Sequence, residues 1–284
     1  MSFQHVTVLG TGVLGAQIAF QTAYSGFDVI AYDVDDAAIA KAREAFAALA
    51  SRYLREVPGA DVAKVEAALA RIGYATDLGH ATANADLVIE AIPERLDLKR
   101  QVYAQLGAVA PTRTVFASNS STLLPSAMAD ATGRPEKFLA LHFANMIWKH
   151  NLAEVMGHPG TDPAVFAQVV AFARAIGMEP VEIHKEQPGY VLNSLLVPFL
   201  SAAGNLLVEG IATPADIDQA WRIGTGAPYG PFQIFDAVGL NTAYNISAAG
   251  GPRQQAFARL LKEQYIDQGK LGYASGEGFY TYPR

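Results

Sequence analysis

His142 and Glu154 are the residues of this chain whose types and spacing most directly suggest catalysis. An apolar run at residues 138–141 leads into His142, and a second apolar run places Glu154 twelve residues further on. A histidine gains and loses one proton near neutral pH, and a neighbouring carboxylate can hold it for that task. The pair therefore predicts a general acid/base at the end of a buried strand. The alternative is a core histidine that only hydrogen-bonds a backbone carbonyl.

The N-terminal stretch carries the glycine pattern of a dinucleotide-binding turn. A β-branched run at residues 5–9 is followed at once by Gly10, Gly12 and Gly15, and a helical pattern begins there. In this motif the first glycine permits a tight turn, the second lets the backbone approach a pyrophosphate, and the third lets helix and strand pack closely. The amino terminus of the helix then faces the phosphates with the positive end of its dipole.

Asp33 is predicted to select the cofactor. It ends the second predicted strand, 23 residues after Gly10. An acidic side chain at this point accepts hydrogen bonds from the adenosine ribose hydroxyls and repels a 2′-phosphate, so NAD is predicted over NADP. The alternative is an acidic turn residue that binds no ligand.

Polar residues also stand at the carboxyl ends of two later strands. The predicted strand at 86–94 runs out at Glu94, and Lys99 lies in the helix that follows. Both residues either reach the nicotinamide ribose or simply belong to the helix start. The next strand ends in the polar cluster 118–122. This cluster is either an N-cap for the following helix or, because open α/β sheets bind ligands at this edge, part of the substrate site.

Composition excludes several classes of function. The 284 residues are 51% hydrophobic and 17% charged, which suits a sizeable core and not a disordered chain. A net charge of -6 and a pI of about 5.5 leave no electrostatic footprint for nucleic acid or an anionic membrane. The absence of cysteine excludes disulfides, thiolate nucleophiles and cysteine–zinc sites, and no metal site is predicted. A strand pattern near the N-terminus and the lack of a long apolar run predict a soluble, cytoplasmic protein.

The order of elements predicts an α/β Rossmann domain with a mostly parallel sheet at residues 1–186, followed by an all-α domain at residues 187–284. Gln187-Pro188-Gly189 marks the predicted boundary. Within the first domain the patterns predict helices at 36–54, 61–69 and 163–176, the last capped by Asp162, and strands at 72–75 and 179–184.

The second domain is expected to be rich in apolar helices. Residues 190–208 are apolar nearly all round and contain Pro198, which predicts a kinked helix that is buried on every side. So much apolar helical surface also predicts burial against a second copy of the chain. Further helices are predicted at 213–224, 231–238, 243–247 and 254–267.

A set of motifs, taken in order and spacing, resembles the 3-hydroxyacyl-CoA dehydrogenase family over nearly the whole chain. The motifs are GTGVLG, Asp33, IEAIPE with Lys99, SNSST, LHFAN, LAEV, GYVLNSLLVP and a terminal GEGFY. The resemblance implies that His142 is the catalytic base, that Glu154 orients it, and that Ser121 and Asn193 donate hydrogen bonds to the reacting oxygen. It also implies a homodimer formed through the second domain, and cofactor contacts from Gly10, Gly12, Gly15, Asp33, Glu94, Lys99 and Asn145. The alternative for Asn193 is a structural role, as a cap or a polar bridge between helices.

This chain departs from the family pattern at positions expected to contact coenzyme A, the carrier of the acyl group, and not at the positions of the redox site. Where the family reads HFFNP, this chain has HFANMIWK from His142 to Lys149, without the proline and with Trp148. Leu49 and Glu56 stand where the family places a serine and a lysine against coenzyme A, and Ala274 replaces a lysine near the C-terminus. An acidic residue facing a phosphorylated carrier is unfavourable. The altered stretch is most similar to the diketoreductase branch of the family. This resemblance implies that the chain reduces free β-keto and β,δ-diketo esters.

The sequence therefore predicts an NADH-dependent oxidoreductase that interconverts β-hydroxy and β-keto compounds, with a small ester favoured over an acyl-CoA as substrate. A short-chain 3-hydroxyacyl-CoA dehydrogenase, such as a 3-hydroxybutyryl-CoA enzyme, is the first alternative, and a sugar-acid 3-dehydrogenase is another. A protein of a different class, an NAD-binding redox sensor or crystallin-like protein without catalysis, would not require Ser121, His142, Glu154 and Asn193 together.

Overall fold

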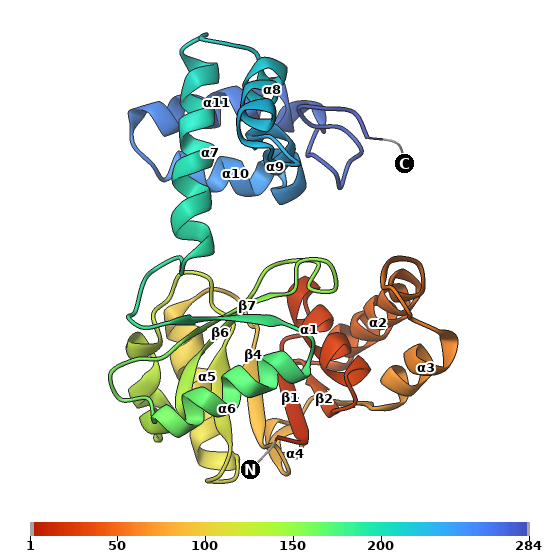
Figure 1. Ribbon diagram of the computed structural model, residues 1–284. Helices are drawn as coiled ribbons and strands as arrows, with labels where there is room; N and C mark the ends of the chain where they lie inside the picture. Colours follow the sequence, from red (N-terminus) through yellow and green to blue (C-terminus); the bar gives the residue numbers. More distant parts are fainter. Residues whose placement is uncertain (1–2, 283–284) are drawn as a thin grey trace. The chain divides into compact units, whose positions relative to one another are not determined.

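The computed structural model describes residues 3–282 and consists of two compact units, which join in the chain between Val191 and Leu192. The first unit combines a sheet with helices, and the second is helical (Figure 1). The predicted fold class, a Rossmann domain followed by an all-α domain, is confirmed. Among residues 3–282, no helix is both long enough and apolar enough to span a bilayer.

The first unit is built on an eight-stranded sheet with the order β3-β2-β1-β4-β5-β6-β7-β8. Its neighbouring strands are parallel except for β6 and β7, which are antiparallel. The order reverses between β1 and β4, and open α/β sheets bind their ligands at the carboxyl ends of the strands at such a point. The strands are β1 (His5–Leu9), β2 (Asp28–Tyr32), β3 (Ile72–Ala75), β4 (Leu87–Glu90), β5 (Val115–Ser118), β6 (Phe138–Phe143), β7 (Leu152–Met156) and β8 (Glu179–Ile183).

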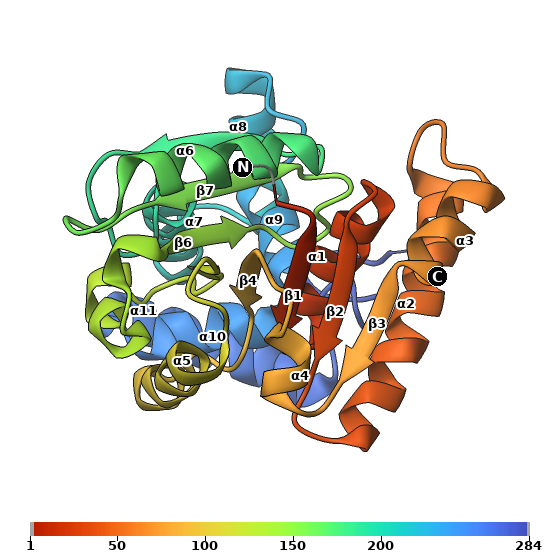
Figure 2. The ribbon, with the colours of Figure 1, turned by 90° about the horizontal axis from the view of Figure 1, so that it is seen from below.

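Helices pack on both faces of this sheet (Figure 2). In β4, Leu87 and Ile89 pack on the face with α1, α2 and α6, whereas Val88 packs on the face with α5. Because both faces are covered, the central strands are continuous apolar runs rather than alternating ones. The helices are α1 (Val13–Tyr24), α2 (Asp36–Glu56), α3 (Val62–Ala70), α4 (Leu78–Thr82), α5 (Leu96–Val109) and α6 (Pro163–Ala175), with the 3₁₀ turns η1 (Pro125–Ala127), η2 (Ala129–Thr132) and η3 (Pro135–Lys137).

The helices of the first unit differ in whether a side chain caps their amino terminus. Asp77 and Asp162, the second of which was predicted as a cap, accept hydrogen bonds from the backbone N–H groups of His80 and Ala164 and so begin α4 and α6. Helix α1 has no such side chain, because its N-cap is Gly12 and its first turn contains no acidic residue. Its N–H groups and the positive end of its dipole are therefore available to an anion.

The second unit is a small helical domain around an aromatic core. Phe232, Phe235 and Phe257 pack together with Leu240 and Leu261. The C-terminal segment folds back through two isolated bridges, between Gly272 and Glu277 and between Glu277 and Thr281. The helices are α7 (Leu192–Val208), α8 (Pro214–Thr225), α9 (Pro231–Val238), α10 (Leu240–Ala248), α11 (Pro252–Gln264) and the 3₁₀ turn η4 (Ile266–Gln268).

Helix α7 differs from its prediction in two respects. It begins at Leu192 and not at residue 190, because Gly189 and Tyr190 have positive φ angles of 79° and 55°, which end any helical path. The prediction of burial on every side is wrong, since Leu195 is 69% exposed. The buried part of the helix includes Gly204, where a Cβ would lie 3.0 Å from the ring of Phe257 in α11.

Candidate active site

The antiparallel pairing of β6 and β7 brings His142 and Glu154 together. The register sets them directly opposite each other, so both side chains project from the same face of the sheet. His142 Nδ1 lies 3.0 Å from Glu154 Oε2, and the two residues are 4% and 1% exposed. A neutral histidine that donates its Nδ1 proton to this carboxylate leaves Nε2 able to accept and return a proton.

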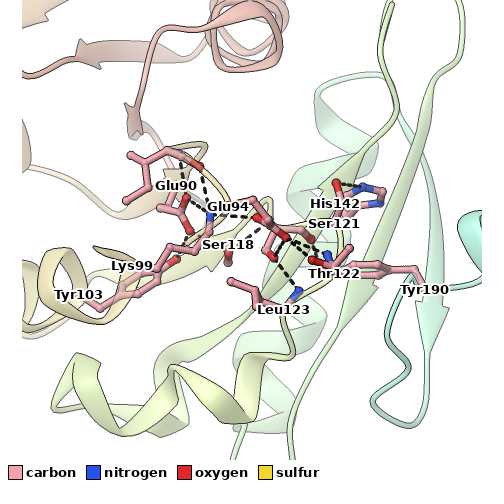
Figure 3. Close-up of polar contacts among 12 residues, drawn as sticks. Glu90, Glu94, Lys99, Tyr103, Ser118, Ser121, Thr122, Leu123, His142 and Tyr190 are labelled. Atoms are coloured by element: carbon pink, nitrogen blue, oxygen red, sulfur yellow. Dashed lines mark hydrogen bonds and ion pairs between the residues drawn. The ribbon is translucent and has the colours of Figure 1, made fainter. Parts of the chain in front are cut away.

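Ser121 completes a three-residue contact with this pair. It lies in the segment that follows β5, and its Oγ is 3.1 Å from His142 Nε2. The structure therefore brings Ser121, His142 and Glu154 into one hydrogen-bonded line. Figure 3 shows the contact between Ser121 and His142. Asn193, the fourth residue that the resemblance implied, lies in the first turn of α7 in the second unit.

A second polar cluster lies beside this line, around Glu90. This glutamate ends β4 with no exposed surface, and Lys99 in α5 is 1% exposed. Lys99 Nζ lies 2.5 Å from Glu90 Oε1, while Ser118 Oγ and Tyr103 Oη donate to Oε2 at 2.8 and 3.1 Å. Burial, with the charge of Glu90, raises the pKa of Tyr103 well above its usual value. The phenol thus remains a hydrogen-bond donor.

Sequence reasoning missed Glu90. The signal was a carboxylate inside an otherwise apolar strand, together with a lysine nine residues later, since buried charges are almost always paired. The structure also corrects the alternative that Lys99 simply decorates a helix start. Its ammonium group is enclosed by Glu90, the carbonyl of Ile92 and Glu94.

Glu94 connects the two clusters. Its Oε1 accepts hydrogen bonds from Ser120 Oγ at 2.5 Å and from the backbone N–H and hydroxyl of Thr122 at 2.9 and 2.8 Å. Burial raises the pKa of Glu94, but these hydrogen bonds and the charge of Lys99 outweigh it and leave the pKa lowered. The cluster 118–122 is therefore not a helix cap. Within it, Ser118 binds Glu90, and Ser120 and Thr122 bind Glu94. The η1 turn that follows begins at Pro125 after Leu124.

The turn after β1 has the shape that a dinucleotide phosphate requires. Gly10 has a φ of 88°, and a Cβ on Gly15 would lie 1.9 Å from the carbonyl oxygen of Gly10. The conformational reasons predicted for these two glycines are confirmed. A Cβ on Gly12, by contrast, would meet nothing within 4 Å, so the backbone there is open to a ligand. Together with the uncapped amino terminus of α1, this turn fits a pyrophosphate.

Asp33 closes the same turn from the end of β2. Its Oδ2 accepts hydrogen bonds from the backbone N–H and the hydroxyl of Thr11, at 2.8 and 2.6 Å. Asp33, Thr11 and Gly12 line a cavity of about 430 Å³ that continues along α2 to Arg52 and Trp148. The carboxylate is thus held in a cavity beside the glycine turn, where a ribose fits the donor and acceptor set.

Leu49 and Trp148, which depart from the family pattern, line this cavity, and Glu56 contacts Trp148. Glu56 Oε2 accepts a hydrogen bond from Trp148 Nε1 at 2.8 Å and lies 3.0 Å from Lys149 Nζ. These two hydrogen bonds lower the pKa of Glu56. The guanidinium of Arg52 lies 5.9 Å from the centre of the Trp148 ring. The glutamate of α2 and the loop after β6 are therefore joined across 92 residues of sequence.

The loop that carries Trp148 is fastened to α1. Met146 has a φ of 59°, and its backbone N–H donates to Gln17 Oε1 at 2.8 Å. Asn145, which the resemblance implied as a cofactor contact, lies in this loop and is exposed. Within residues 3–282 there is no cluster of three or more histidine, aspartate or glutamate side chains suited to a metal ion.

Comparison with known proteins gives matches along the whole chain. The family models for the NAD binding domain and the C-terminal domain of 3-hydroxyacyl-CoA dehydrogenase match residues 5–187 and 189–282. Human mitochondrial hydroxyacyl-coenzyme A dehydrogenase is 37% identical over 289 residues, which cover 98% of this chain and 91% of the human protein. A probable 3-hydroxybutyryl-CoA dehydrogenase of Bacillus subtilis is 32% identical, with 99% and 98% covered. The solved structure of a diketoreductase, described for substrate-directed dual catalysis of dicarbonyl compounds, matches with a TM-score of 0.97 at 61% identity, over 99% of this chain and 100% of that one.

Proposed function

The chain belongs to the 3-hydroxyacyl-CoA dehydrogenase family and is an NAD-dependent oxidoreductase acting on CH–OH groups, and from this premise we propose that it reduces the keto group of free β-keto and β,δ-diketo esters. The line from Ser121 through His142 to Glu154 supports the reaction type. The similarity to a diketoreductase at 61% identity supports the substrate class.

The proposed mechanism moves one proton through His142. NADH, when bound, supplies the hydride that adds to the carbonyl carbon. As the carbonyl double bond opens, Ser121 Oγ and the Asn193 amide donate hydrogen bonds to the oxygen on which negative charge develops. His142 Nε2 then gives this oxygen its proton, and Glu154 stabilises the imidazolium until the transfer. In the oxidation of an alcohol, the same nitrogen removes the hydroxyl proton.

The role of the first unit in this scheme is cofactor binding. Gly10, Gly12 and Gly15 would leave the backbone free to approach the pyrophosphate, and Asp33 would accept hydrogen bonds from the adenosine ribose. The nicotinamide ribose would lie toward Glu94 and Asn145, and Lys99, which the resemblance also implied as a contact, would act through Glu94, whose Oε2 lies 3.5 Å from its Nζ. We propose residues 1–186 as the NAD domain and residues 187–284 as the domain that adds Asn193 to the substrate site.

The carboxylate of Glu56 favours a free ester over an acyl-CoA as the substrate. A phosphorylated carrier lying along α2 would meet a carboxylate that is already hydrogen-bonded to Trp148 and paired with Lys149. Displacing these partners, or placing phosphate beside the carboxylate, costs binding free energy. Leu49, which stands at the other substituted position, is buried and offers the carrier no hydrogen bond.

A 3-hydroxybutyryl-CoA dehydrogenase is the second candidate, and two cations favour it. Lys41 and Arg52 line the same cavity as Asp33 and Trp148. Either could pair with a carrier phosphate in place of the lysine that the chain lacks. The human and Bacillus subtilis relatives, both dehydrogenases by name, are similar to this chain over nearly their full lengths.

One comparison of substrates separates these candidates. NADH oxidation by the purified protein is measured with acetoacetyl-CoA, ethyl acetoacetate and a β,δ-diketo ester, and we expect kcat/KM for the free esters to match or exceed that for the thioester. A preference for acetoacetyl-CoA by orders of magnitude would contradict the proposal and identify an acyl-CoA enzyme. Normal NADH binding without turnover of any β-carbonyl would instead support the non-catalytic reading.

A charge-reversal pair tests the role of Glu56 directly. Glu56→Lys should raise kcat/KM for acetoacetyl-CoA by about tenfold and leave that for ethyl acetoacetate nearly unchanged, because only the carrier bears phosphates. Glu66→Lys makes the same change of charge at an exposed position of α3 and serves as the matched control. An equal gain from both variants would mean that the net charge of the protein, and not the position of Glu56, governs the effect.

The exposed apolar side chains of the second unit support a homodimer. Leu195 in α7, Ile223 in α8 and Ile246 in α10 are 69%, 76% and 49% exposed, and an interface with a second copy of the chain would remove such side chains from water. Sedimentation equilibrium should give twice the chain mass of 30.2 kDa, and Ile246→Glu should lower it. The cytoplasmic location stays a prediction from the sequence.

A further inference from the structure

Tyr190 has a backbone conformation that residues with a side chain rarely adopt. Its φ of 55° lies in the left-handed region, and it follows Gly189, whose φ is 79°. The side chain is nevertheless only 1% exposed. A conformation of this kind persists where the surrounding structure holds it, often at a functional site. The contacts of Tyr190 therefore show what this turn stabilises.

The phenol ring of Tyr190 lies flat against the imidazole of His142. The ring centroids are 4.5 Å apart and the planes are inclined by 16°. A stacked ring opposes rotation of the imidazole out of its plane. The contacts of Nδ1 with Glu154 and of Nε2 with Ser121 both need this one orientation. Tyr190 thus stabilises the ring position on which both contacts depend.

The hydroxyl of Tyr190 reaches the peptide that precedes Ser121. It donates a hydrogen bond of 2.7 Å to the carbonyl oxygen of Ser120, and the peptide bond from this carbonyl leads directly to Ser121. Figure 3 shows Tyr190 beside the segment of Ser121 and Thr122. A single side chain therefore contacts the imidazole of His142 and the peptide that precedes Ser121, and the distance between Ser121 Oγ and His142 Nε2 is 3.1 Å.

The residue after Tyr190 binds the third member of the line. The backbone N–H of Val191 donates to Glu154 Oε1 at 2.9 Å, while Oε2 of the same carboxylate faces His142. A charge-assisted hydrogen bond of this kind fixes the orientation of a carboxylate. The turn at residues 189–191 thus contacts Ser120, His142 and Glu154 at once.

We propose that Tyr190 is a positioning residue, which sets the distance between Ser121 Oγ and His142 Nε2 by stacking on the imidazole and hydrogen-bonding the peptide next to the serine. This inference rests on the proposed function, since it concerns the proton that His142 moves. The competing role is structural, because Tyr190 also packs with Ala140, Met156 and Ile183 in a small apolar cluster. The two roles differ in the effect of losing the hydroxyl alone.

Two substitutions separate the hydroxyl from the ring. Tyr190→Phe keeps the stack and the cluster packing, and should lower kcat about tenfold, while Tyr190→Leu should lower it about a hundredfold, because small displacements of reacting groups are costly. Neither should change the Kd for NADH. The control is Tyr280→Phe, which loses a phenol hydrogen bond of 2.9 Å to the buried Asp218 in the second unit and should retain kcat. Unchanged kcat in Tyr190→Phe would overturn the proposal.

A double-mutant cycle with Ser121→Ala tests the route of the effect. If the hydroxyl of Tyr190 acts by placing Ser121, then Tyr190→Phe should change kcat less than twofold when Ser121 is already alanine, because the two residues share one interaction. A tenfold loss in both backgrounds would mean that Tyr190 does not act through Ser121, and the positioning role would be wrong.

Nuclear magnetic resonance of protein labelled with ¹⁵N-histidine gives a readout that needs no substrate. The ring nitrogens of His142, assigned by comparison with His142→Ala, should give sharp signals in the wild type and shifted or broadened signals in Tyr190→Leu, because the unstacked ring is free to reorient. Identical signals would overturn the proposal. Altered signals in a protein that turns over no β-carbonyl would support the positioning contact and contradict the proposed function instead.

Discussion

The first unit contains two buried pairs of a cation-forming side chain and a carboxylate, and they differ in what surrounds them. Glu154 holds His142 at 3.0 Å, and Glu90 holds Lys99 at 2.5 Å. None of the four residues is more than 4% exposed. Distance and burial alone therefore do not distinguish a pair that moves protons from a pair that supports the fold.

The distinction lies in the atoms that each pair leaves available. His142 uses Nδ1 for Glu154 and presents Nε2 to Ser121, whose side chain is only partly buried. The ammonium of Lys99 is instead enclosed by Glu90, Glu94 and the carbonyl of Ile92. A buried titratable group becomes available for catalysis when one of its polar atoms still faces a ligand site. We infer that the Lys99 pair holds the site in shape.

The largest effect is expected at His142. His142→Ala should lower kcat by a factor of about 10³ to 10⁴, because it removes the group that moves the proton. The Kd for NADH, measured by nicotinamide fluorescence, should stay nearly the same.

His158→Ala is the matched control for this substitution. His158 Nε2 lies 2.9 Å from the carbonyl oxygen of Pro135, which is the structural role that a core histidine usually has. This variant should lose stability and retain kcat. If His142→Ala weakens NADH binding as much as it lowers turnover, the contrast between the two pairs fails and His142 is structural as well.

The next largest effect is expected at Lys99, and it should appear in stability. Lys99→Met leaves the carboxylate of Glu90 buried without its cation, which should cost about 3–5 kcal/mol of the free energy of unfolding. Urea unfolding measures this loss. The double variant with Glu90→Leu should recover much of it, because replacing a buried ion pair by apolar side chains is often nearly neutral.

The same variants test whether Lys99 also touches the cofactor. A stable Lys99→Met protein with a much weaker affinity for NADH would show that Lys99 is a ligand of the nicotinamide ribose rather than a support for Glu90. The pair of Glu90 and Lys99 would then have a functional role, as the pair of Glu154 and His142 does. The enclosure of the Lys99 ammonium would no longer distinguish the two pairs.

Sequence patterns predicted that His142 and Glu154 act together because each residue lies in an apolar run that forms a strand, and the structure shows them in contact. They did not predict the register, since the pairing of His142 with Glu154 depends on how β6 and β7 align. The pair of Glu90 and Lys99 was harder to predict, because Glu90 lies in β4 and Lys99 in α5. The side-chain periods of a strand and a helix differ, so sequence spacing does not show which of their residues meet. Only the rule that buried charges are paired points to Glu90.

Two further features could not be predicted from local patterns. Tyr190 belongs to an apolar run that continues into α7, so the helix was expected to include it, and only the left-handed φ of 55° excludes it. Glu56 and Trp148 lie 92 residues apart, and their hydrogen bond depends on the packing of α2 against the loop after β6. Propensity and periodicity describe neighbours in the chain, whereas these contacts arise from tertiary structure.

The smallest effect is expected at Glu94, which joins the two pairs. Burial raises its pKa, but hydrogen bonds from Ser120 and Thr122 and the charge of Lys99 hold the pKa below the ordinary value of 4.5. Because the pKa is lower in the folded state, the unfolded chain binds the proton more tightly. The stabilisation by Glu94 is therefore complete above about pH 4.5 and is lost as the pH falls through the folded-state pKa.

Glu94→Gln should accordingly be less stable than the wild type at pH 7 and lose less further stability between pH 5 and pH 3, as measured by urea unfolding. Glu66→Gln, at an exposed position of α3, should leave the pH profile unchanged. The glutamine oxygen still accepts from Ser120 and Thr122, so Ser121 should remain in place and kcat should fall only about threefold. A loss of kcat as large as that of His142→Ala would mean that Glu94 takes part in the proton transfer itself. Glu94 would then belong with His142 and Glu154 and not with the supporting pair of Glu90 and Lys99.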